Sequence, residues 1–391
     1  MLAGVVVLDF SRVLAGPFCS ALLADLGADV IKVEPPQGDD QRWMGAFKDG
    51  VSVSFELINR SKRSIRLDLK SEAGRQIALA LAERADVVIE NFRPGVAARL
   101  GIGYEALRER RADIVYCSIS GFGQTGPMAQ FPSYDVIAQA LSGLMSLTGK
   151  PDEDPVLVGE SIGDSVSGLY GALGIALALL RRATTGEGAR IDIAMFDALF
   201  SLLPTALAAW QVTGEAPGRA GNQHPLSAPF GAYAAADGPF MLAIANKALF
   251  SRFATLIGRP ELARDPRFDS DQTRRQNQAP LRHVIEQWAH DKSTHAVVAL
   301  LGEAGIPASP IWNVAQAATS GHATSRRLMT EVAHPKLGRL GLPEQPLHIA
   351  GLARGAARRA PDLGADGAEI LGRLLGMAPD EVQRLADDGV I

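Results

Sequence analysis

Asp164 is the side chain in this sequence with the clearest capacity for covalent chemistry. It lies in segment 159–165 (GESIGDS), between flanking glycines and directly before a long apolar stretch. A carboxylate held ionised at the start of a helix can attack an activated acyl group. The same carboxylate can instead cap the helix, because Asp accepts hydrogen bonds from free backbone N–H groups and is stabilised by the helix dipole. Taken alone, the residues favour the cap.

Segment 121–126 (GFGQTG) matches the GxGxxG pattern of a dinucleotide-binding turn and follows a predicted strand. Pro127 and Pro132 interrupt the helix that should face the phosphates. No acidic residue ends a second strand about 20 residues further on, as a ribose-binding site requires. The pattern therefore does not support a nicotinamide site.

Histidine and cysteine are distributed in a way that excludes several kinds of site. All seven histidines lie from His224 onward, so the first half of the chain cannot supply a Ser-His or Cys-His relay. Cys19 and Cys117 are far apart and fit neither a disulfide framework nor a zinc site. We expect no metal.

Strand ends offer candidates for binding a phosphorylated ligand, because ligands of open parallel sheets bind beyond the carboxyl ends of the strands. Five basic residues stand near such ends: Arg12, Arg42, Lys70, Arg93 and Arg99. Asn91 and Phe92 follow the predicted strand 86–90, where an amide and an aromatic ring can receive an adenine. Each of these residues, considered singly, is more simply a solvated side chain.

The elements that position these residues alternate between short β-branched runs and amphipathic helices, which is typical of a parallel sheet covered by helices. Strands are predicted at 5–9, 29–33, 64–67, 86–90, 114–118 and 190–194, and helices at 18–26, 71–84, 164–182 and 196–211. Ser71 is expected to cap its helix. Gly168, Gly171 and Gly174 leave one stripe of the helix 164–182 without side chains, so another backbone can approach it.

Composition changes at 213–229, which is rich in Gly, Pro and polar residues, and we place a domain boundary there. The predicted domains are 1–212, a smaller α+β unit at 213–324, and a C-terminal segment 325–391. The smaller unit has strands at 232–235 and 240–244 and helices at 247–257, 281–289 and 294–304. The C-terminal segment has two strand-like pieces, an arginine-rich stretch with Arg354, Arg358 and Arg359, and two closing helices.

Charge and hydropathy point to a cytoplasmic globular protein. The 391 residues are 47% apolar and carry a net charge of -4, so no positive field attracts nucleic acid or an anionic membrane. The first residues lack the pattern of a secretory signal. The longest apolar run, 169–180, is shorter than the about 20 residues of a membrane span. We interpret it as a buried core helix.

Several collinear segments resemble the family III CoA-transferases, a group that includes formyl-CoA transferase, the carnitine CoA-transferases and the α-methylacyl-CoA racemases. The matching segments are 7–17 (VLDFSRVLAGP), 23–34 (LADLGADVIKVE), 64–70 (SIRLDLK), 85–95 (ADVVIENFRPG), 118–127 (SISGFGQTGP), 163–173, 185–197 and 359–371. The resemblance covers nearly the whole chain. It implies an α/β fold: a Rossmann-like large domain with a parallel sheet built from both chain ends, a smaller inserted α+β domain, and an interlocked homodimer.

The resemblance also implies roles for individual residues. Asp164 matches the aspartate that forms the covalent intermediate. Val13, Leu14 and Ala15 match the loop beside the thioester and nucleotide. The CoA-contacting positions are matched by Leu67, Lys70, Asn91, Phe92, Arg99 and Leu100, and the floor of the active site by Tyr134 and Asp135. The implied substrates are an acyl-CoA and a small carboxylic acid, with no cofactor beyond coenzyme A itself.

The implied reaction starts with attack of Asp164 on the donor thioester, which gives an anhydride and free CoA thiolate. CoA then forms an aspartyl thioester, the acceptor carboxylate attacks it, and CoA opens the second anhydride. Backbone N–H groups near Ala15, Gly16 and Gly163 are expected to stabilise the oxyanions.

Two rival activities remain. A racemase needs paired bases, and Tyr134, with an ordinary pKa of about 10, replaces the expected histidine. A non-catalytic CoA-binding protein is disfavoured by the intact Asp164.

Two differences from formyl-CoA transferase disfavour formate and oxalate as substrates. Leu14 stands in place of a glutamine, and segment 221–229 (GNQHPLSAP) lacks a run of glycines. That segment is more similar to family members that use succinyl-CoA and other dicarboxylic acids. His224 within it could pair with a distal carboxylate or lie exposed in a loop.

Overall fold

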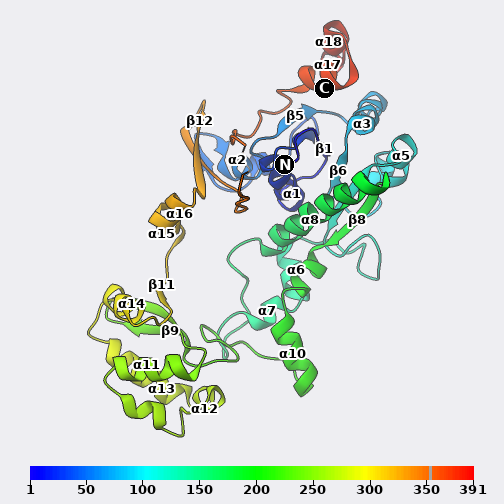
Figure 1. Ribbon diagram of the computed structural model, residues 1–391. Helices are drawn as coiled ribbons and strands as arrows, with labels where there is room; N and C mark the ends of the chain where they lie inside the picture. The colour runs from blue at the N-terminus through cyan, green and yellow to red at the C-terminus, as the bar shows by residue number, and fades with distance from the viewer. Residues whose placement is uncertain (352–354) are drawn as a thin grey trace. The chain divides into compact units, whose positions relative to one another are not determined.

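The computed structural model describes residues 1–351 and 355–391, so Arg354 of the arginine-rich stretch lies outside the described residues. The chain forms two compact units (Figure 1): unit 1 comprises 1–145, 157–214 and 321–391, and unit 2 comprises 146–156 and 215–320. Segment 146–156 was not expected in the smaller unit. It belongs there because the Arg219 side chain donates hydrogen bonds to the backbone carbonyls of Lys150, Pro151 and Glu153.

A six-stranded parallel sheet forms the centre of unit 1. Its order is β5 (Arg63–Arg66), β2 (Asp29–Glu34), β1 (Val6–Asp9), β6 (Val87–Glu90), β7 (Val115–Ser120) and β8 (Ala189–Ala194). Every predicted strand of this sheet is present to within two residues. The order places the topological switch point between β1 and β6. Strands β2 and β5 follow on the β1 side of this point, and β7 and β8 follow on the β6 side.

The prediction that both chain ends build the sheet is wrong for the strands. All six come from the first 194 residues. The strand-like pieces near the C-terminus pair with each other as an antiparallel hairpin, β12 (Met329–His334) and β13 (Gly338–Pro343). Three residues separate them, which permits a hairpin, whereas a parallel pair needs a long crossover. The C-terminal end contributes helices instead: α17 (Gly367–Leu375) and α18 (Pro379–Asp387).

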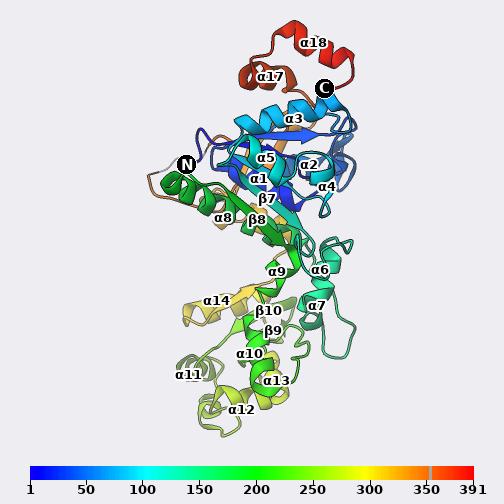
Figure 2. The same cartoon turned by 90° about the vertical axis from the view of Figure 1, so that its right-hand side faces the viewer.

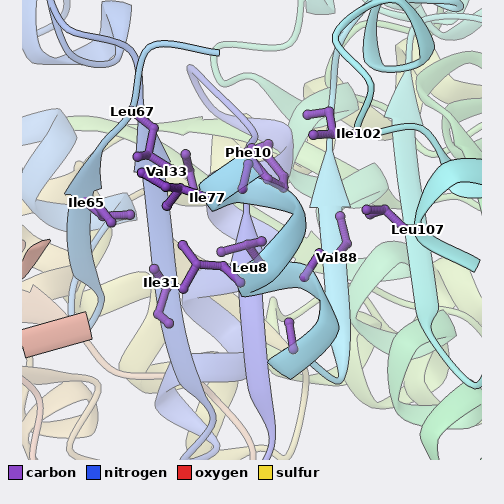
Figure 3. Close-up of a cluster of buried hydrophobic side chains, with 14 of the residues drawn as sticks. Leu8, Phe10, Ile31, Val33, Ile65, Leu67, Ile77, Val88, Ile102 and Leu107 are labelled. Atoms are coloured by element: carbon purple, nitrogen blue, oxygen red, sulfur yellow. The ribbon is translucent and has the colours of Figure 1, made fainter. Parts of the chain in front are cut away.

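Successive side chains of the strands enter two different cores, as the period of a β-strand requires. On one face, Leu8, Ile31, Val88 and their neighbours pack against α3 (Glu72–Arg84), α5 (Tyr104–Arg110) and the C-terminal helices (Figure 3). On the other face, Val7, Val30 and Val87 pack against α1 (Ala15–Asp25) and α8 (Ile162–Thr185). Figure 2 shows α8 running beside the sheet. Each fully buried aliphatic side chain stabilises the fold by about 1.5–3 kcal/mol. Ser71 caps α3, as predicted.

The glycine stripe of α8 packs closely against α1. A Cβ atom at Gly168 would lie 2.6 Å from the carbonyl oxygen of Ala15. The opposite face of α8 is solvent-exposed in this chain, with Leu169, Leu173, Leu177 and Leu180 each more than half exposed. The prediction of a buried core helix therefore holds for one face only. By length and composition alone, α8 also meets the criteria for a membrane span.

The predicted helix 196–211 is two helices, α9 (Met195–Phe200) and α10 (Pro204–Thr213). The break falls at Pro204, the first residue of α10, because proline cannot donate the hydrogen bond that would continue α9. The remaining short elements of unit 1 are η1 (Asp40–Trp43), β3 (Phe47–Lys48), β4 (Val51–Ser52), α2 (Val53–Ile58), α4 (Val96–Arg99), α6 (Asp135–Leu141) and α16 (Gly321–Ser325), and α7 (Leu144–Leu147) lies at the boundary with unit 2.

Unit 2 has its own core around a three-stranded antiparallel sheet. The strands are β9 (Phe230–Ala235), β10 (Gly238–Ala243) and β11 (Ala308–Pro310). The helices are α11 (Lys247–Leu256), η2 (Pro260–Arg264), α12 (Asp271–Gln276), α13 (Gln278–Ala289), α14 (Thr294–Glu303) and α15 (Val314–Thr319). His224 lies in this unit, with its ring stacked on Phe230 at a centroid distance of 4.7 Å.

Candidate active site

The loops that follow β1 and β6 meet at the switch point of the sheet. Asn91, directly after β6, holds the backbone of Arg12 after β1 by two hydrogen bonds. Its Oδ1 accepts from the Arg12 N–H at 2.8 Å, and its Nδ2 donates to the Arg12 carbonyl at 2.7 Å. Both ends of the amide are thus occupied within the protein. The Asn91 amide therefore fixes the β1 loop, and its contact with CoA stays a prediction.

A cavity of about 330 Å³ opens beside these loops. It brings together seven of the predicted residues: Val13, Leu14, Ala15, Asn91, Phe92, Tyr134 and Asp164. It also contains residues that are not among the CoA-contacting positions implied by the resemblance, notably Arg12, Ser120, Phe131 and Met195. Arg12 stood among the basic residues near strand ends, and that signal could have found it. Ser120 ends β7, the third strand to reach this edge, but one serine at a strand end gives little signal in a sequence.

Asp164 is not the cap of its helix. Helix α8 begins at Ile162 after the N-cap residue Ser161, so Asp164 lies within the first turn. The capping acceptor is Asp135 from α6. Its Oδ1 accepts hydrogen bonds from Gly163 N at 2.6 Å and Asp164 N at 3.3 Å. Because another carboxylate satisfies these donors, the Asp164 side chain is left for the cavity.

The environment of Asp164 raises the pKa of its carboxyl group to about 7. Burial is the larger cause, because it disfavours the ionised form, and the nearby charge of Asp135 adds to it. A hydrogen bond from the backbone N–H of Ala15, in the first turn of α1, opposes both effects. A carboxylate of raised pKa is more basic and a better nucleophile than an ordinary aspartate, at the cost of being only part ionised near neutral pH.

This arrangement affects the backbone N–H groups near Ala15, Gly16 and Gly163, which were expected to stabilise the oxyanions. The Gly163 N–H donates to Asp135, so it is not available to a reaction intermediate. The backbone of Ala15 lies close enough to Asp164 to lower the pKa of its carboxyl group. Gly16 is required for packing, because a Cβ there would lie 2.2 Å from the Cβ of Ser11. Of the three predicted positions, Ala15, at the N-terminus of α1, lines the cavity, whereas Gly16 and Gly163 do not.

A second cavity of about 450 Å³ adjoins the first and shares Arg12, Phe92 and Val96 with it. Its lining is mainly apolar, with Pro35, Pro36 and Leu69 beside four predicted residues: Leu67, Lys70, Phe92 and Leu100. Leu67 is fully buried and forms part of the floor. Arg99 is exposed at the end of α4 and, like the buried Asp135, is in the lining of neither cavity.

The basic residues near the strand ends divide into two groups. Arg42 donates two hydrogen bonds of 2.7 Å to Glu34 and stacks on Phe55 at 3.9 Å, so it is committed to the protein interior. Arg12 is part exposed, lies 5.7 Å from the centre of the Phe92 ring, and faces both cavities. Arg12 and Lys70 both line the second cavity and can bind phosphate there, whereas Arg42 is held by Glu34.

Glycine-rich segment 121–126 follows β7 but leads into no helix, since the next helix is α6 at Asp135. Within residues 1–351 and 355–391, no group of three His, Cys, Asp or Glu side chains could hold a metal ion. Cys19 and Cys117 are buried in the core, and burial raises the pKa of both thiols.

Fold and cavities together define a Rossmann-like α/β protein that presents a carboxylate of raised pKa in a ligand cavity at the switch point. The sequence model of CoA-transferase family III matches residues 2–367, and the chain belongs to this family.

Named relatives and solved structures agree with this assignment. The chain is 42% identical to the acetyl-CoA:oxalate CoA-transferase of Acetobacter aceti, over 94% of each chain. It is 35% identical to the succinyl-CoA–D-citramalate CoA-transferase of Chloroflexus aurantiacus, over 98% of this chain and 96% of that one. A crystal structure of a CAIB/BAIF family protein from Brucella suis superposes with a TM-score of 0.85 at 37% identity, covering 95% of this chain and 99% of that one. The protein is a CoA-transferase.

Proposed function

We propose that this protein transfers CoA from an acyl-CoA to a small dicarboxylic acid, with Asp164 as the covalent nucleophile. The observation that carries the proposal is the position of Asp164. Its half-buried carboxylate faces a cavity at the carboxyl edge of the sheet, while Asp135 supplies the helix cap that Asp164 would otherwise provide. Family membership and the names of the relatives support CoA transfer as the reaction.

CoA would extend across the two adjoining cavities. The apolar second cavity, with Leu67, Leu100 and the Phe92 ring, suits the adenine. Arg12 and Lys70 would bind the phosphates, since both are cationic and accessible at its rim. The pantetheine arm would pass Phe92 into the first cavity and bring its thioester to Asp164.

The reaction needs four steps that conserve the energy of the thioester. Asp164 attacks the thioester carbonyl and expels CoA thiolate, leaving an acyl-aspartyl anhydride. The thiolate attacks the aspartyl carbonyl, which forms aspartyl-CoA and releases the donor acid. The acceptor carboxylate attacks aspartyl-CoA and gives a second anhydride with free thiolate. The thiolate attacks the acyl carbonyl of that anhydride, releasing the new acyl-CoA and regenerating Asp164.

The acceptor range proposed here includes oxalate. The differences at Leu14 and in segment 221–229 led to an expectation against oxalate. The 42% identical relative from Acetobacter aceti is named for oxalate, and the relative from Chloroflexus aurantiacus is named for citramalate with succinyl-CoA. Both acids carry two carboxylates, so a dicarboxylic acid is the shared chemistry. Formate has no second carboxylate and stays outside the proposal.

Mass spectrometry tests the covalent intermediate directly. The protein is incubated with succinyl-CoA, and its intact mass is measured before and after hydroxylamine. We expect a CoA-sized adduct that hydroxylamine removes, and none in Asp164→Ala. Asp197→Ala removes an exposed carboxylate of α9 and is the control that should keep the adduct. An adduct that survives in Asp164→Ala excludes this nucleophile.

Exchange of the α-proton distinguishes transfer from racemisation. In heavy water, a racemase incorporates deuterium at the α-carbon of an acyl-CoA without exchanging CoA between acids. We expect CoA exchange without such incorporation. Deuterium uptake in the absence of CoA exchange would replace the transferase proposal by the racemase alternative.

The proposed assembly is an interlocked homodimer in the cytoplasm. The apolar stripe of α8 formed by Leu169, Leu173, Leu177 and Leu180 supports a second copy as its cover. A bilayer is a poor alternative, because the opposite face of α8 contributes Ala172, Ile175 and Ala178 to the core beneath the sheet. A helix that completes such a core cannot also be surrounded by lipid.

A further inference from the structure

Buried charged residues hold the loop between β1 and α1 at several points. Lys32 and Asp39 form an ion pair of 2.7 Å with no exposure of either side chain. Lys32 Nζ also donates to the Ser11 carbonyl at 3.0 Å, and Asp39 Oδ1 accepts from the Val13 N–H at 3.0 Å. A second buried pair, Lys62 and Asp9, lies beside it, and Lys62 Nζ donates to the Pro17 carbonyl at 3.0 Å.

Stability alone does not account for these pairs. Burying two opposite charges costs about as much desolvation energy as their attraction returns, so apolar residues of the same size would serve the fold equally well. The partners of the charges are more informative. All four charged side chains hydrogen-bond backbone groups of residues 11–17, the segment that contains Ala15 and leads into α1 beside Asp164.

Val13 has a backbone conformation that a β-branched residue rarely adopts. Its φ is +65°, in the left-handed region that favours glycine. Strained backbone of this kind persists only where the surroundings hold it in place, and it gathers at functional sites. The hydrogen bond from the Val13 N–H to Asp39 is the direct restraint on this residue, with Arg12 clamped by Asn91 on one side and α1 beginning at Ala15 on the other.

We infer that Asp39 is a positioning residue for the transferase reaction, and that it acts by holding Val13 in the left-handed conformation that directs the first turn of α1 at Asp164. The inference rests on the proposed function. Asp39 lines neither cavity and its side chain is fully buried, so it acts through the loop and not by touching substrate. Its ordinary interpretation, as one half of a structural ion pair, predicts a different outcome in the experiment below.

Two double variants of equal charge distinguish the positioning role of Asp39 from a purely structural ion pair. Lys32→Met with Asp39→Asn removes both charges and retains an acceptor oxygen for the Val13 N–H. Lys32→Met with Asp39→Leu removes both charges and the acceptor. Since a misplacement of about 1 Å in an active site costs about 10²-fold in rate, we expect kcat of the Leu variant to be about 10²-fold below that of the Asn variant. Binding of free CoA, measured by calorimetry, should agree within about threefold, because the second cavity is unchanged.

A rescue variant distinguishes positioning from a general loss of structure. Glycine adopts a positive φ without strain, so adding Val13→Gly to the Leu variant should recover about tenfold in kcat. Equal kcat in the two double variants, or a loss that glycine does not recover in a protein of unchanged melting temperature, would overturn the inference.

If the Leu variant does not fold, Asp39→Asn with and without Val13→Gly is the second comparison. It weakens the restraint by removing the ion pair while remaining isosteric. Glycine should then raise kcat of Asp39→Asn, and no increase would contradict the inference. Failure of the proposed function is a separate result, because it appears as a wild-type protein that forms no hydroxylamine-sensitive adduct.

Discussion

Asp135 accepts a hydrogen bond from the backbone N–H of Asp164 and, through its own charge, raises the pKa of the Asp164 side chain. One carboxylate thus serves the structural role of a helix cap so that the other can remain reactive. A second bond, from Gln139 Nε2 to Asp135 Oδ2 at 2.6 Å, holds the capping side chain in place.

The formation of the covalent adduct should depend on pH through Asp164. Burial and the charge of Asp135 raise the pKa of Asp164 to about 7, and only the ionised form attacks a thioester. Adduct formation in single-turnover experiments should rise about tenfold per pH unit below 7 and level off above it. Asp135→Asn keeps an acceptor for the helix cap and removes the like charge, so its profile should shift to lower pH. An unshifted profile would contradict the coupling of the two residues.

Asp164→Asn should stabilise the fold at high pH. A carboxyl group whose pKa is raised in the folded state destabilises the fold once ionised, and this penalty grows from its ordinary pKa of 3.8 to about 7. We expect the free energy of unfolding at pH 8 to increase by about 1–2 kcal/mol after allowance for partial exposure, with little change at pH 4. Urea denaturation at both pH values is the measurement. An equal change at both would show that the charge is not its cause.

Lys70→Met should weaken the use of acyl-CoA. Lys70 is exposed at the rim of the second cavity, and losing one charge-assisted contact to phosphate costs about 1 kcal/mol, or roughly fivefold in KM. The effect should shrink at high salt, because salt screens exposed charges. Lys336→Met, at an exposed position in the β12–β13 turn, is the matched control and should leave KM unchanged.

Gly168→Ala should damage both stability and activity. The added Cβ would lie 2.6 Å from the Ala15 carbonyl and 3.0 Å from the Phe18 ring, so α1 must shift away from α8. We expect a loss of about 1–3 kcal/mol in unfolding free energy and a fall in kcat, because Ala15 adjoins Asp164. Gly372→Ala in α17, whose nearest contact would be 3.8 Å away, should instead be neutral or stabilising by about 0.5–1 kcal/mol. Thermal melts of both variants provide the comparison.

Leu173→Glu should dissociate the proposed dimer. Leu173 is 51% exposed in the middle of the apolar stripe of α8, and a charge there cannot be buried against a second copy without a large desolvation cost. Light scattering after size-exclusion chromatography should report a dimer for the wild type and a monomer for this variant. Val314→Glu, at a residue that is 86% exposed on α15, is the control. A wild-type monomer would contradict the proposed assembly.

The sequence determined the sheet through local patterns, and the family resemblance of the motif around Asp164 singled out this residue as the predicted nucleophile. Six β-branched runs, separated by helix-length segments, predict parallel strands whatever their order. Glycines at three-residue spacing predict the close approach on α8, and the motif around Asp164 marks one acidic residue among 43 Asp and Glu. Each of these features is contained in a few neighbouring residues.

Only the tertiary structure decided which polar side chains hold other parts of the protein in place and which remain available to a ligand. Asn91 clamps Arg12, Arg42 binds Glu34, Asp135 caps α8, and Asp39 holds Val13, although several of these residue types looked equally suited to a ligand. The partners lie 8 to 79 residues apart in the sequence, so nothing in the local pattern identifies them. A buried polar group must find a partner, and which one it finds is fixed when the strands assemble into a sheet.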